Sequence, residues 1–177
     1  MKAILVRHTQ IATNAAGLCY GRCDVACAET FTEEAAALQS SLPWQPSAVW
    51  SSPASRCTNL ATRLARAAPV QIDERLQELN FGEWEGQRWE AFHDAASDAW
   101  ALDPWNLRPP AGETGLELWA RVAQLREQVL ALPVTTQLLI VTHAGVIRCW
   151  QALAAAQPAG SNVFDLAVGY GKIWPAL

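Results

Sequence analysis

The sequence ILVRHT, residues 4–9, places an arginine and a histidine directly after three aliphatic residues. Two of those three are β-branched, which favours a buried β-strand. Arg7 and His8 are costly to bury unpaired, so a strand that runs into them is expected to end where a ligand binds. In open α/β sheets, ligands lie at the carboxyl ends of the strands. On this motif alone a second interpretation stays open, that the strand merely reaches solvent there.

Residues 138–145, LLIVTHAG, repeat this arrangement late in the chain. Four aliphatic residues lead into Thr142 and His143, and a segment compatible with a helix follows at once. The chain has three histidines, and two of them lie at the ends of its two clearest predicted strands. Packing is a poor explanation for that coincidence, so His8 and His143 become candidate site residues.

The rest of the chain alternates predicted strands with predicted helices. We expect strands over residues 4–6, 48–51, 70–72, 138–142, 163–168 and 172–174. We expect helices over residues 30–41, 53–67, 87–99, 116–132 and 144–156, with His93 at the surface. This order predicts a three-layer α/β/α fold with a mainly parallel central sheet. An antiparallel hairpin is expected at the end, around the turn at residues 169–171.

Two helix starts carry local signals. Thr30 and Glu33 have the spacing of a capping box, and Ser52-Pro53 matches an N-cap followed by proline at the first helical position. Arg56 then falls in the first turn, where the free N–H groups and the helix dipole favour anions. A cation there is unfavourable unless a bound anion compensates it, which makes Arg56 a candidate anion ligand. The competing interpretation is an exposed helical arginine.

Two predicted loops carry further candidates. The loop over residues 9–29 is long and leaves the predicted rim directly, so a functional role is favoured. Asn14 within it either is a turn residue or reaches back to an anion. The loop over residues 73–86 holds several acids. Glu78, between two leucines, is best placed for partial burial, but chemistry alone does not decide between it and Glu83.

Size and charge limit the classes of protein. A chain of 177 residues is expected to form one domain, residues 1–177. A net charge of −4 and a pI near 5.3 argue against a general nucleic-acid binder, but they leave room for a local anion pocket. Met1-Lys2 leads directly into the first strand and no apolar run is long enough to span a membrane, so we expect a cytoplasmic protein without a membrane partner.

Cysteine and tryptophan are the unusual residues of the composition. Five cysteines, an odd number, are expected to be reduced thiols. Cys19, Cys23 and Cys27 recur at every fourth position but lack the paired spacing of zinc sites, so a role as apolar filler is favoured over metal binding. The nine tryptophans are expected in the core or at the mouth of a cleft. One hypothesis places three of them at the entrance of the site: Trp84, Trp105 and Trp119.

Together, these side chains point to phosphoryl chemistry. The planar guanidinium groups of Arg7 and Arg56 suit a tetrahedral oxyanion. A neutral imidazole is a competent nucleophile, while the second histidine can donate to phosphate oxygens. A carboxylic acid can protonate the leaving alkoxide. The sequence has no Walker loop and no acidic cluster for Mg²⁺, so we expect no cofactor, no metal and a small-molecule phosphomonoester as the partner.

The motifs resemble, in the same order, those of the histidine phosphatase superfamily, also called the phosphoglycerate-mutase-like fold. They are Arg7-His8-Thr9, Asn14, Ser51-Ser52-Pro53-x-x-Arg56, Arg75-Leu76-x-Glu78, Gly112-Glu113-Thr114 and Thr142-His143-Ala144-Gly145. The resemblance implies that His8 becomes a phosphohistidine and that Glu78 is the proton donor. It also implies a set of residues that hold the phosphoryl group and the substrate: Arg7, Asn14, Arg56 and His143, with Thr9, Tyr20, Gly21 and Ala144.

Within the superfamily, the chain is most similar to α-ribazole-5′-phosphate phosphatases of cobalamin biosynthesis, through residues 19–25, 81–86 and 164–171. This implies hydrolysis of α-ribazole 5′-phosphate or its cobalamin-precursor form. Arg22 stands where an uncharged residue is usual, and Thr114 replaces the commoner serine. Three further functions stay open: a broad-specificity histidine phosphatase, a phosphoglycerate-mutase-like enzyme and a non-catalytic phosphate-binding module. The oligomeric state, monomer or homodimer, is left open.

Overall fold

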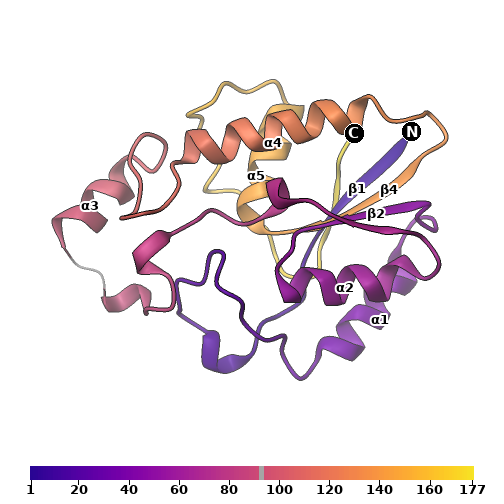
Figure 1. Ribbon diagram of the computed structural model, residues 1–177, viewed down its shortest axis with the longest axis horizontal. Coiled ribbons are helices and arrows are strands. Elements are labelled where there is room, and N and C mark those ends of the chain that lie inside the picture. Colours follow the sequence, from indigo (N-terminus) through magenta and orange to yellow (C-terminus); the bar gives the residue numbers. More distant parts are fainter. Residues whose placement is uncertain (92–93) are drawn as a thin grey trace.

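The computed structural model describes residues 1–91 and 94–177, and its centre is a five-stranded sheet (Figure 1). The strand order is β3-β2-β4-β1-β5. Four strands are mutually parallel, and β5 runs antiparallel to β1. The strands are β1 (Lys2–Arg7), β2 (Ala48–Ser51), β3 (Val70–Ile72), β4 (Gln137–Thr142) and β5 (Ile173–Pro175). The predicted mainly parallel sheet is confirmed.

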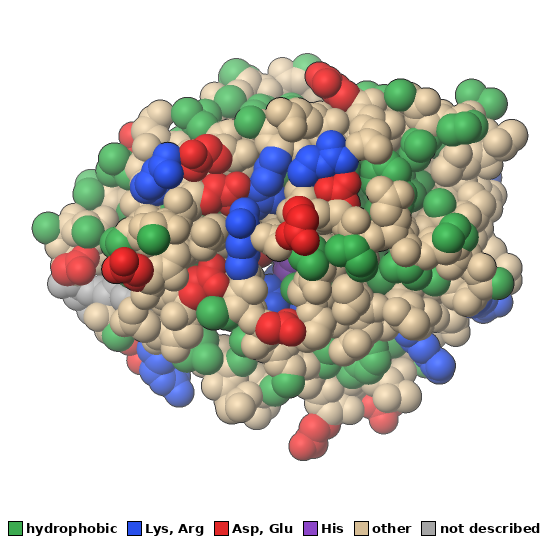
Figure 2. Space-filling view, in the orientation of Figure 1, with side chains coloured by type: hydrophobic (Ala, Val, Ile, Leu, Met, Phe, Trp, Pro, Cys, Tyr) green, Lys and Arg blue, Asp and Glu red, His purple; other side chains and the backbone are tan. Residues whose placement is uncertain are grey.

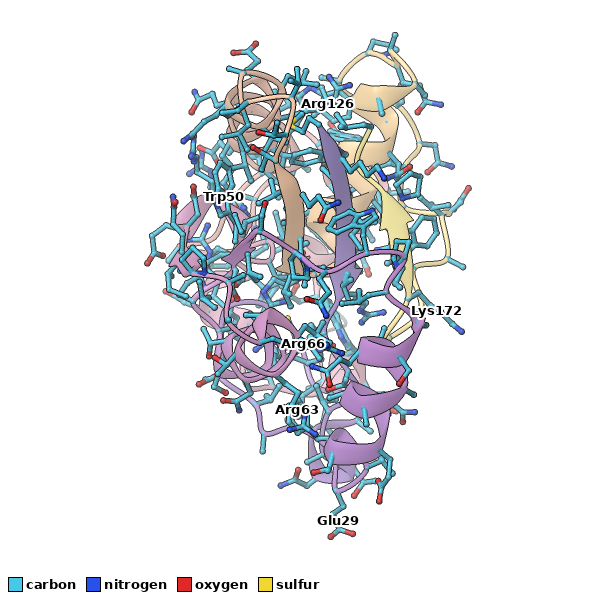
Figure 3. The ribbon with its side chains drawn as sticks, turned by 90° about the vertical axis from the view of Figure 1, so that its right-hand side faces the viewer. Glu29, Trp50, Arg63, Arg66, Arg126 and Lys172 are labelled. Carbon is cyan, nitrogen blue, oxygen red and sulfur yellow. The ribbon has the colours of Figure 1, made fainter. Side chains whose placement is uncertain are left out.

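The two central strands end level with each other. Their register runs from Lys2 opposite Gln137 to Arg7 opposite Thr142. His8 and His143 are the next residues along each strand, and the backbone N–H of His8 still donates to the carbonyl oxygen of Thr142 (3.1 Å). The register therefore brings the two histidines out of the sheet side by side. Figure 3 shows β4, β1 and β5 next to one another in that order.

Helices cover both faces of the sheet, which confirms the three-layer arrangement (Figure 1). One face carries α1 (Phe31–Ser41) and α2 (Ser55–Ala65), and the other carries α4 (Gly115–Leu130) and α5 (Ala144–Ala154). Because successive side chains of a strand point to opposite faces, β1 divides its own side chains: Ile4 and Val6 pack with α1 and α2, whereas Leu5 packs with α4 and α5. Each large aliphatic side chain buried this way contributes about 1.5–3 kcal/mol.

The helix predicted over residues 116–132 forms as α4. Leu118, Val122, Leu125 and Val129 follow one another at intervals of three or four residues along it, and all four are buried. Thr114 caps it: its hydroxyl accepts from the Glu117 N–H (3.1 Å), and the Glu117 carboxylate accepts from the Thr114 N–H (2.8 Å). The reciprocal capping box fixes where α4 begins.

Three helix predictions need correction. The cap at α1 differs, because Thr30 Oγ1 donates to Glu34 (2.5 Å) rather than pairing with Glu33. α2 begins at Ser55, with Ala54 as N-cap, because the predicted cap Ser52 bonds His143 instead (2.8 Å). The helix predicted over 87–99 is replaced by a 3₁₀ turn, Trp89–Ala91, and by the short helix α3, Ala95–Leu102, which a capping box at Asp94 starts. The expectation for His93 falls outside the described residues.

The predicted hairpin at the end of the chain is wrong. Residues 163–168 are irregular, although β5 forms close to its predicted place. Arginine side chains take backbone oxygens that a strand ladder would use: Arg148 Nε donates to Leu166 O (2.9 Å) and Arg7 Nη1 donates to Val168 O. β5 instead pairs with β1 directly. Within the described residues, no helix has both the length and the hydrophobicity that a membrane crossing requires.

Candidate active site

His8 is held as a neutral imidazole with one free ring nitrogen. It is buried (1 % exposed), and its Nδ1 lies 2.8 Å from the carbonyl oxygen of Thr9. A carbonyl only accepts, so Nδ1 carries the proton and Nε2 carries the lone pair. Burial, followed by the positive charges of Arg56 and Arg7, lowers the pKa of His8 to about 3. The tautomer and the charge state are those a nucleophilic histidine needs.

His143 stands beside it at the start of α5. The two ring centroids are 5.3 Å apart. Arg56 Nη2 lies 3.4 Å from Nδ1 of His143 and can only donate, so Nδ1 accepts and Nε2–H donates to Ser52 Oγ (2.8 Å). Burial, with the charges of His8 and Arg56, lowers the pKa of His143 well below its usual value. Both rings are therefore neutral at physiological pH.

Arg56 is wholly buried (0 % exposed) in the first turn of α2. Its guanidinium donates to the backbone oxygens of Gly21 (2.7 Å) and Cys23 (2.9 Å), and Asp24 lies 3.8 Å away. These bonds fold the long loop onto the site. Within the described residues its Nε–H has no hydrogen-bond partner. A buried unsatisfied donor beside a histidine pair favours an anionic ligand there.

Arg7 supplies a second guanidinium from the end of β1. It donates to the backbone oxygen of Val168, and its Cζ lies 3.8 Å from the ring centroid of Tyr170. Its Nε–H is also buried without a partner among the described residues. The loop that replaces the predicted hairpin therefore serves to orient Arg7 next to His8.

A tyrosine pair lies over these groups. The hydroxyls of Tyr20 and Tyr170 are 3.0 Å apart, and the Tyr170 ring centroid is 5.5 Å from that of His8. The Tyr20 ring lies 5.1 Å from the Arg56 guanidinium. Burial, and then the bond to Tyr170, raise the pKa of Tyr20. The sequence predicts Tyr170 as part of the turn at residues 169–171 and of the run 164–171 that carries the resemblance, but it does not predict the contact with His8.

Glu78 borders a pocket of about 190 Å³ that opens beside the histidines. Its carboxylate accepts from the backbone N–H of Leu79 (2.9 Å) and of Gly145 (3.1 Å to either oxygen). Gly145 lies in the first turn of α5, where the helix dipole favours a negative charge. His143, Ser52 and Arg22 also line the pocket. Figure 2 shows this face, with charged side chains around a hollow in which a histidine is visible.

The structure separates the two acids that the sequence left open. Glu78 is half-buried and lines the pocket, whereas Glu83 is exposed and lies outside the pocket lining. His8 is also outside that lining: it lies further in, against His143 and the tyrosine pair.

Of the remaining predicted site residues, three lie at the site and one does not. Thr9 and Ala144 are buried next to the two histidines in the chain, and Gly21 holds Arg56 through its backbone oxygen. Asn14 lies in the 3₁₀ turn Thr13–Ala15, exposed, and its side chain bonds no other described residue. The structure thus brings together most of the predicted set but leaves Asn14 apart from it.

The sequence missed Ser52 as a site residue, because Ser-Ser-Pro has the pattern of a helix cap. The tryptophan hypothesis also fails: Trp84, Trp105 and Trp119 are buried, and none of them lines the pocket. Trp105 and Trp119 pack edge to face at 5.7 Å in the core. Among the described residues, no three His, Cys, Asp or Glu side chains gather closely enough to hold a metal ion.

The chain belongs to the histidine phosphatase superfamily, branch 1, whose family model matches residues 3–170. It is therefore a phosphatase with a phosphoglycerate-mutase-like fold.

The chain is similar to two relatives and to a solved structure that bear phosphatase names. The adenosylcobalamin/α-ribazole phosphatase of Salmonella typhimurium is 30 % identical over 167 residues, which cover 91 % of this chain and 83 % of that protein. A Hydrogenobacter thermophilus protein, provisionally named phosphoserine phosphatase 2, is 30 % identical over 150 residues, 81 % of this chain and 73 % of its own. The crystal structure of the α-ribazole phosphatase from Shigella flexneri superposes with a TM-score of 0.87 at 26 % identity, covering 98 % of this chain and 88 % of that one.

Proposed function

We propose that this phosphatase hydrolyses phosphomonoesters through a phosphohistidine at His8. One observation carries the proposal: the bond from Nδ1 to the Thr9 carbonyl leaves Nε2 unprotonated on a ring flanked by Arg7 and Arg56, whose Nε–H donors are buried and have no partner among the described residues. Arg56 and Arg7 place positive charge near the His8 ring, and the His143 ring lies beside it. Such a cluster stabilises the charge of a phosphoryl group in transfer.

The reaction has two steps. In the first, Nε2 of His8 forms a bond to phosphorus as the ester P–O bond breaks, and the protonated carboxyl of Glu78 gives its proton to the leaving alkoxide. In the second, the Glu78 carboxylate takes a proton from water, and the water oxygen bonds to phosphorus as the P–N bond breaks. Inorganic phosphate and neutral His8 result. The pocket beside Glu78 is where the leaving group and then the water would lie.

For the substrate we propose α-ribazole 5′-phosphate or its cobalamin-precursor form. Support comes from the Salmonella relative, which spans most of both chains, and from the Shigella structure. The equally identical Hydrogenobacter relative makes phosphoserine the second candidate. Broad specificity for phosphomonoesters and a phosphoglycerate-mutase-like activity rank below these two substrates.

The test is phosphate release from a panel of esters with EDTA present: α-ribazole 5′-phosphate, phosphoserine, 3-phosphoglycerate, a sugar phosphate and a nucleoside monophosphate. A large kcat/KM preference for α-ribazole 5′-phosphate supports the proposed substrate, and a preference for phosphoserine replaces it. Equal, weak rates support broad specificity. Activity that EDTA abolishes and Mg²⁺ restores would contradict a metal-free reaction.

The intermediate is tested separately by quenching the enzyme in alkaline detergent during turnover of a substrate with a radiolabelled phosphoryl group. Acid-labile, base-stable label on the wild type, absent from His8→Asn, supports the phosphohistidine. Phosphate binding without turnover would instead favour a non-catalytic phosphate-binding module. The absence of nucleic-acid binding, the monomer or homodimer and the cytoplasmic location also stay predictions, which electrophoretic mobility shift, light scattering and cell fractionation address.

A further inference from the structure

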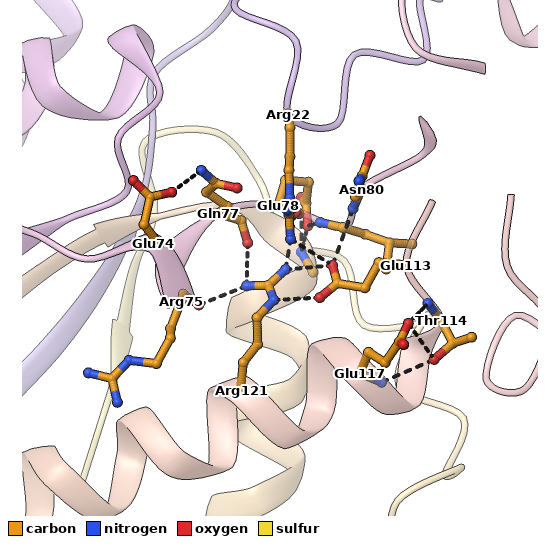
Figure 4. Close-up of polar contacts among 12 residues, drawn as sticks. Arg22, Glu74, Arg75, Gln77, Glu78, Asn80, Glu113, Thr114, Glu117 and Arg121 are labelled. Atoms are coloured by element: carbon orange, nitrogen blue, oxygen red, sulfur yellow. Dashed lines mark hydrogen bonds and ion pairs between the residues drawn. The ribbon is translucent and has the colours of Figure 1, made fainter. Parts of the chain in front are cut away.

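We propose that Arg121 and Glu113 are positioning residues that hold Glu78 in place, an inference that rests on the proposed acid role of Glu78. Neither residue lines the pocket or touches the histidines. Figure 4 shows them beneath the segment that carries Glu78, with Arg121 reaching up from α4.

Arg121 gathers the backbone oxygens of the segment that leads into Glu78. Its Nη1 donates to Arg75 O and Gln77 O, both at 2.7 Å, and its Nη2 donates to Glu78 O at 3.1 Å. Residues 77–81 belong to no helix or strand. Carbonyl groups in such a segment have no partners from regular secondary structure, so the guanidinium of Arg121 on the well-packed helix α4 donates to them instead.

Glu113 fixes the orientation of that guanidinium. Its carboxylate makes a bidentate pair with Arg121, Oε1 to Nε at 2.7 Å and Oε2 to Nη2 at 2.9 Å. Bidentate pairing fixes the plane of the fork as well as its place. Glu113 also accepts from the N–H of Asn80 (3.3 Å), and its own N–H donates to Asn80 O (2.8 Å). The segment is thus held on both sides of Glu78.

The pair is nearly buried, with side-chain exposures of 14 % for Arg121 and 11 % for Glu113. A buried ion pair is a poor choice for stability alone, because desolvation opposes the attraction. A role in holding Glu78 in position would explain why this buried ion pair is present. Among the described residues, the carboxylate of Glu78 has only backbone N–H partners, at Leu79 and Gly145, so small shifts of its backbone move the acid relative to the leaving oxygen.

Arg22 adds a third, looser contact from the long loop. Its Nε lies 3.3 Å from Glu78 O, and its Nη2 lies 3.2 Å from Glu113 Oε2. Its side chain is 35 % exposed. We expect a smaller contribution from Arg22 than from Arg121, since its bonds are longer and it lies in an irregular segment.

The test compares two substrates whose leaving groups differ in how much they depend on protonation by an acid. The ester of 4-nitrophenol releases an anion that needs little protonation, whereas glycerol phosphate releases an alkoxide that needs it fully. The readout is kcat/KM, which reports the step that releases the alcohol, because hydrolysis of the phosphohistidine is common to both esters. Glu78→Gln is therefore expected to lower kcat/KM for glycerol phosphate far more than for the nitrophenyl ester. Arg121→Lys and Glu113→Gln should copy this pattern: about a tenfold loss of kcat/KM on glycerol phosphate and no more than about twofold on the nitrophenyl ester.

Arg108→Lys is the matched control. Arg108 pairs with Glu117 (2.9 Å) at the exposed start of α4, away from Glu78, so its ratio of the two rates should stay that of the wild type. Circular dichroism and thermal melting check the fold of each variant. If Arg121→Lys does not fold, Glu113→Gln and Arg22→Gln decide, with about a threefold change of the ratio expected for Arg22→Gln.

The outcomes separate the two proposals. If Glu78→Gln leaves the ratio unchanged, Glu78 is not the acid, and the positioning role fails with it. If Glu78→Gln changes the ratio and the folded Arg121 and Glu113 variants do not, the acid role stands and the positioning role is overturned. A uniform loss on both esters in those variants also overturns it, because a merely structural defect lowers both rates equally.

Discussion

At the scale of single residues, the burial of His8 decides how the protein responds to acid. Its pKa, about 3 in the folded protein, is about 6.5 when unperturbed. Between those values the unfolded state binds the proton and the folded state does not, so stability is complete above pH 6.5 and is lost as pH falls toward 3. For one histidine, the loss from pH 7 to pH 5 is about 2 kcal/mol at most.

We therefore predict that lowering the pH from 7 to 5 reduces the free energy of unfolding less in His8→Asn than in the wild type. Urea unfolding at both values measures the difference. His143 adds the same kind of loss to both proteins, because burial lowers its pKa too. Equal losses in the two proteins would mean that His8 is protonated in the folded state near neutrality.

A second residue-scale prediction concerns the two acids. Glu78→Gln should lower kcat on an alkyl phosphate by about a hundredfold, the scale of general acid catalysis. Glu83→Gln should change it less than twofold, because that side chain is exposed and outside the pocket. Steady-state kinetics on both variants tests this, and the reverse order would move the acid role to Glu83.

A third prediction at the residue scale concerns Ser52. Its hydroxyl is the 2.8 Å partner of Nε2 of buried His143, so Ser52→Ala leaves that donor with the weak acceptor Cys57 Sγ at 3.5 Å and frees the ring to turn. We expect about a tenfold fall in kcat with the fold retained. Ser51→Ala is the control, since Ser51 is equally buried but its hydroxyl bonds only the neighbouring backbone oxygen (2.9 Å). Equal effects of the two changes would argue against a role through His143.

At the scale of elements, the start of α5 and the acid segment are fitted to each other at one glycine. A Cβ on Gly145 would lie 2.2 Å from Glu78 Oε1. Gly145→Ala should therefore push the carboxylate aside and reduce kcat on alkyl phosphates at least about tenfold.

The matched change is Gly115→Ala at the start of α4, where a Cβ would lie 2.8 Å from the Trp105 ring. This should lower the melting temperature but leave the activity of the folded enzyme near that of the wild type. Kinetics and thermal unfolding on both variants give the comparison, and normal activity in Gly145→Ala would show that Glu78 can move without consequence.

Elements with strong local signals could be predicted, and those shaped by distant partners could not. The aliphatic runs of β1 and β4 predict both strands, and their parallel pairing predicts that His8 and His143 meet. Two of the failures share one cause: a side chain distant in the sequence bonds to a group that the local pattern assigns to a helix cap or a strand. Ser52, predicted to cap α2, bonds to His143 instead. Backbone oxygens of residues 163–168, predicted to pair in a hairpin, accept hydrogen bonds from Arg7 and Arg148 instead. The Glu113–Arg121 pair has no local signal at all.

At the scale of the whole molecule, the topology predicts late pairing of the interior strand β1. β1 pairs only with β4 and β5, which lie more than a hundred residues away. Contacts of such separation form slowly. During refolding, the amides of Leu5 and Val6 should gain protection together with those of Ile140 and Val141, and after those of α4, which form within one helix. Pulse-labelled hydrogen exchange measures this order, and protection of β1 ahead of β4 would contradict it.

The interior place of β1 also matters while the protein is being made. The ribosome produces β1 before β4, and at roughly 5–20 residues per second β4 follows on the order of ten seconds later. Throughout that time an aliphatic strand with both edges unpaired is attached to a growing chain, a form that invites aggregation. The strand that ends at His8, the proposed nucleophile, is thus a part of the nascent protein that a chaperone would protect.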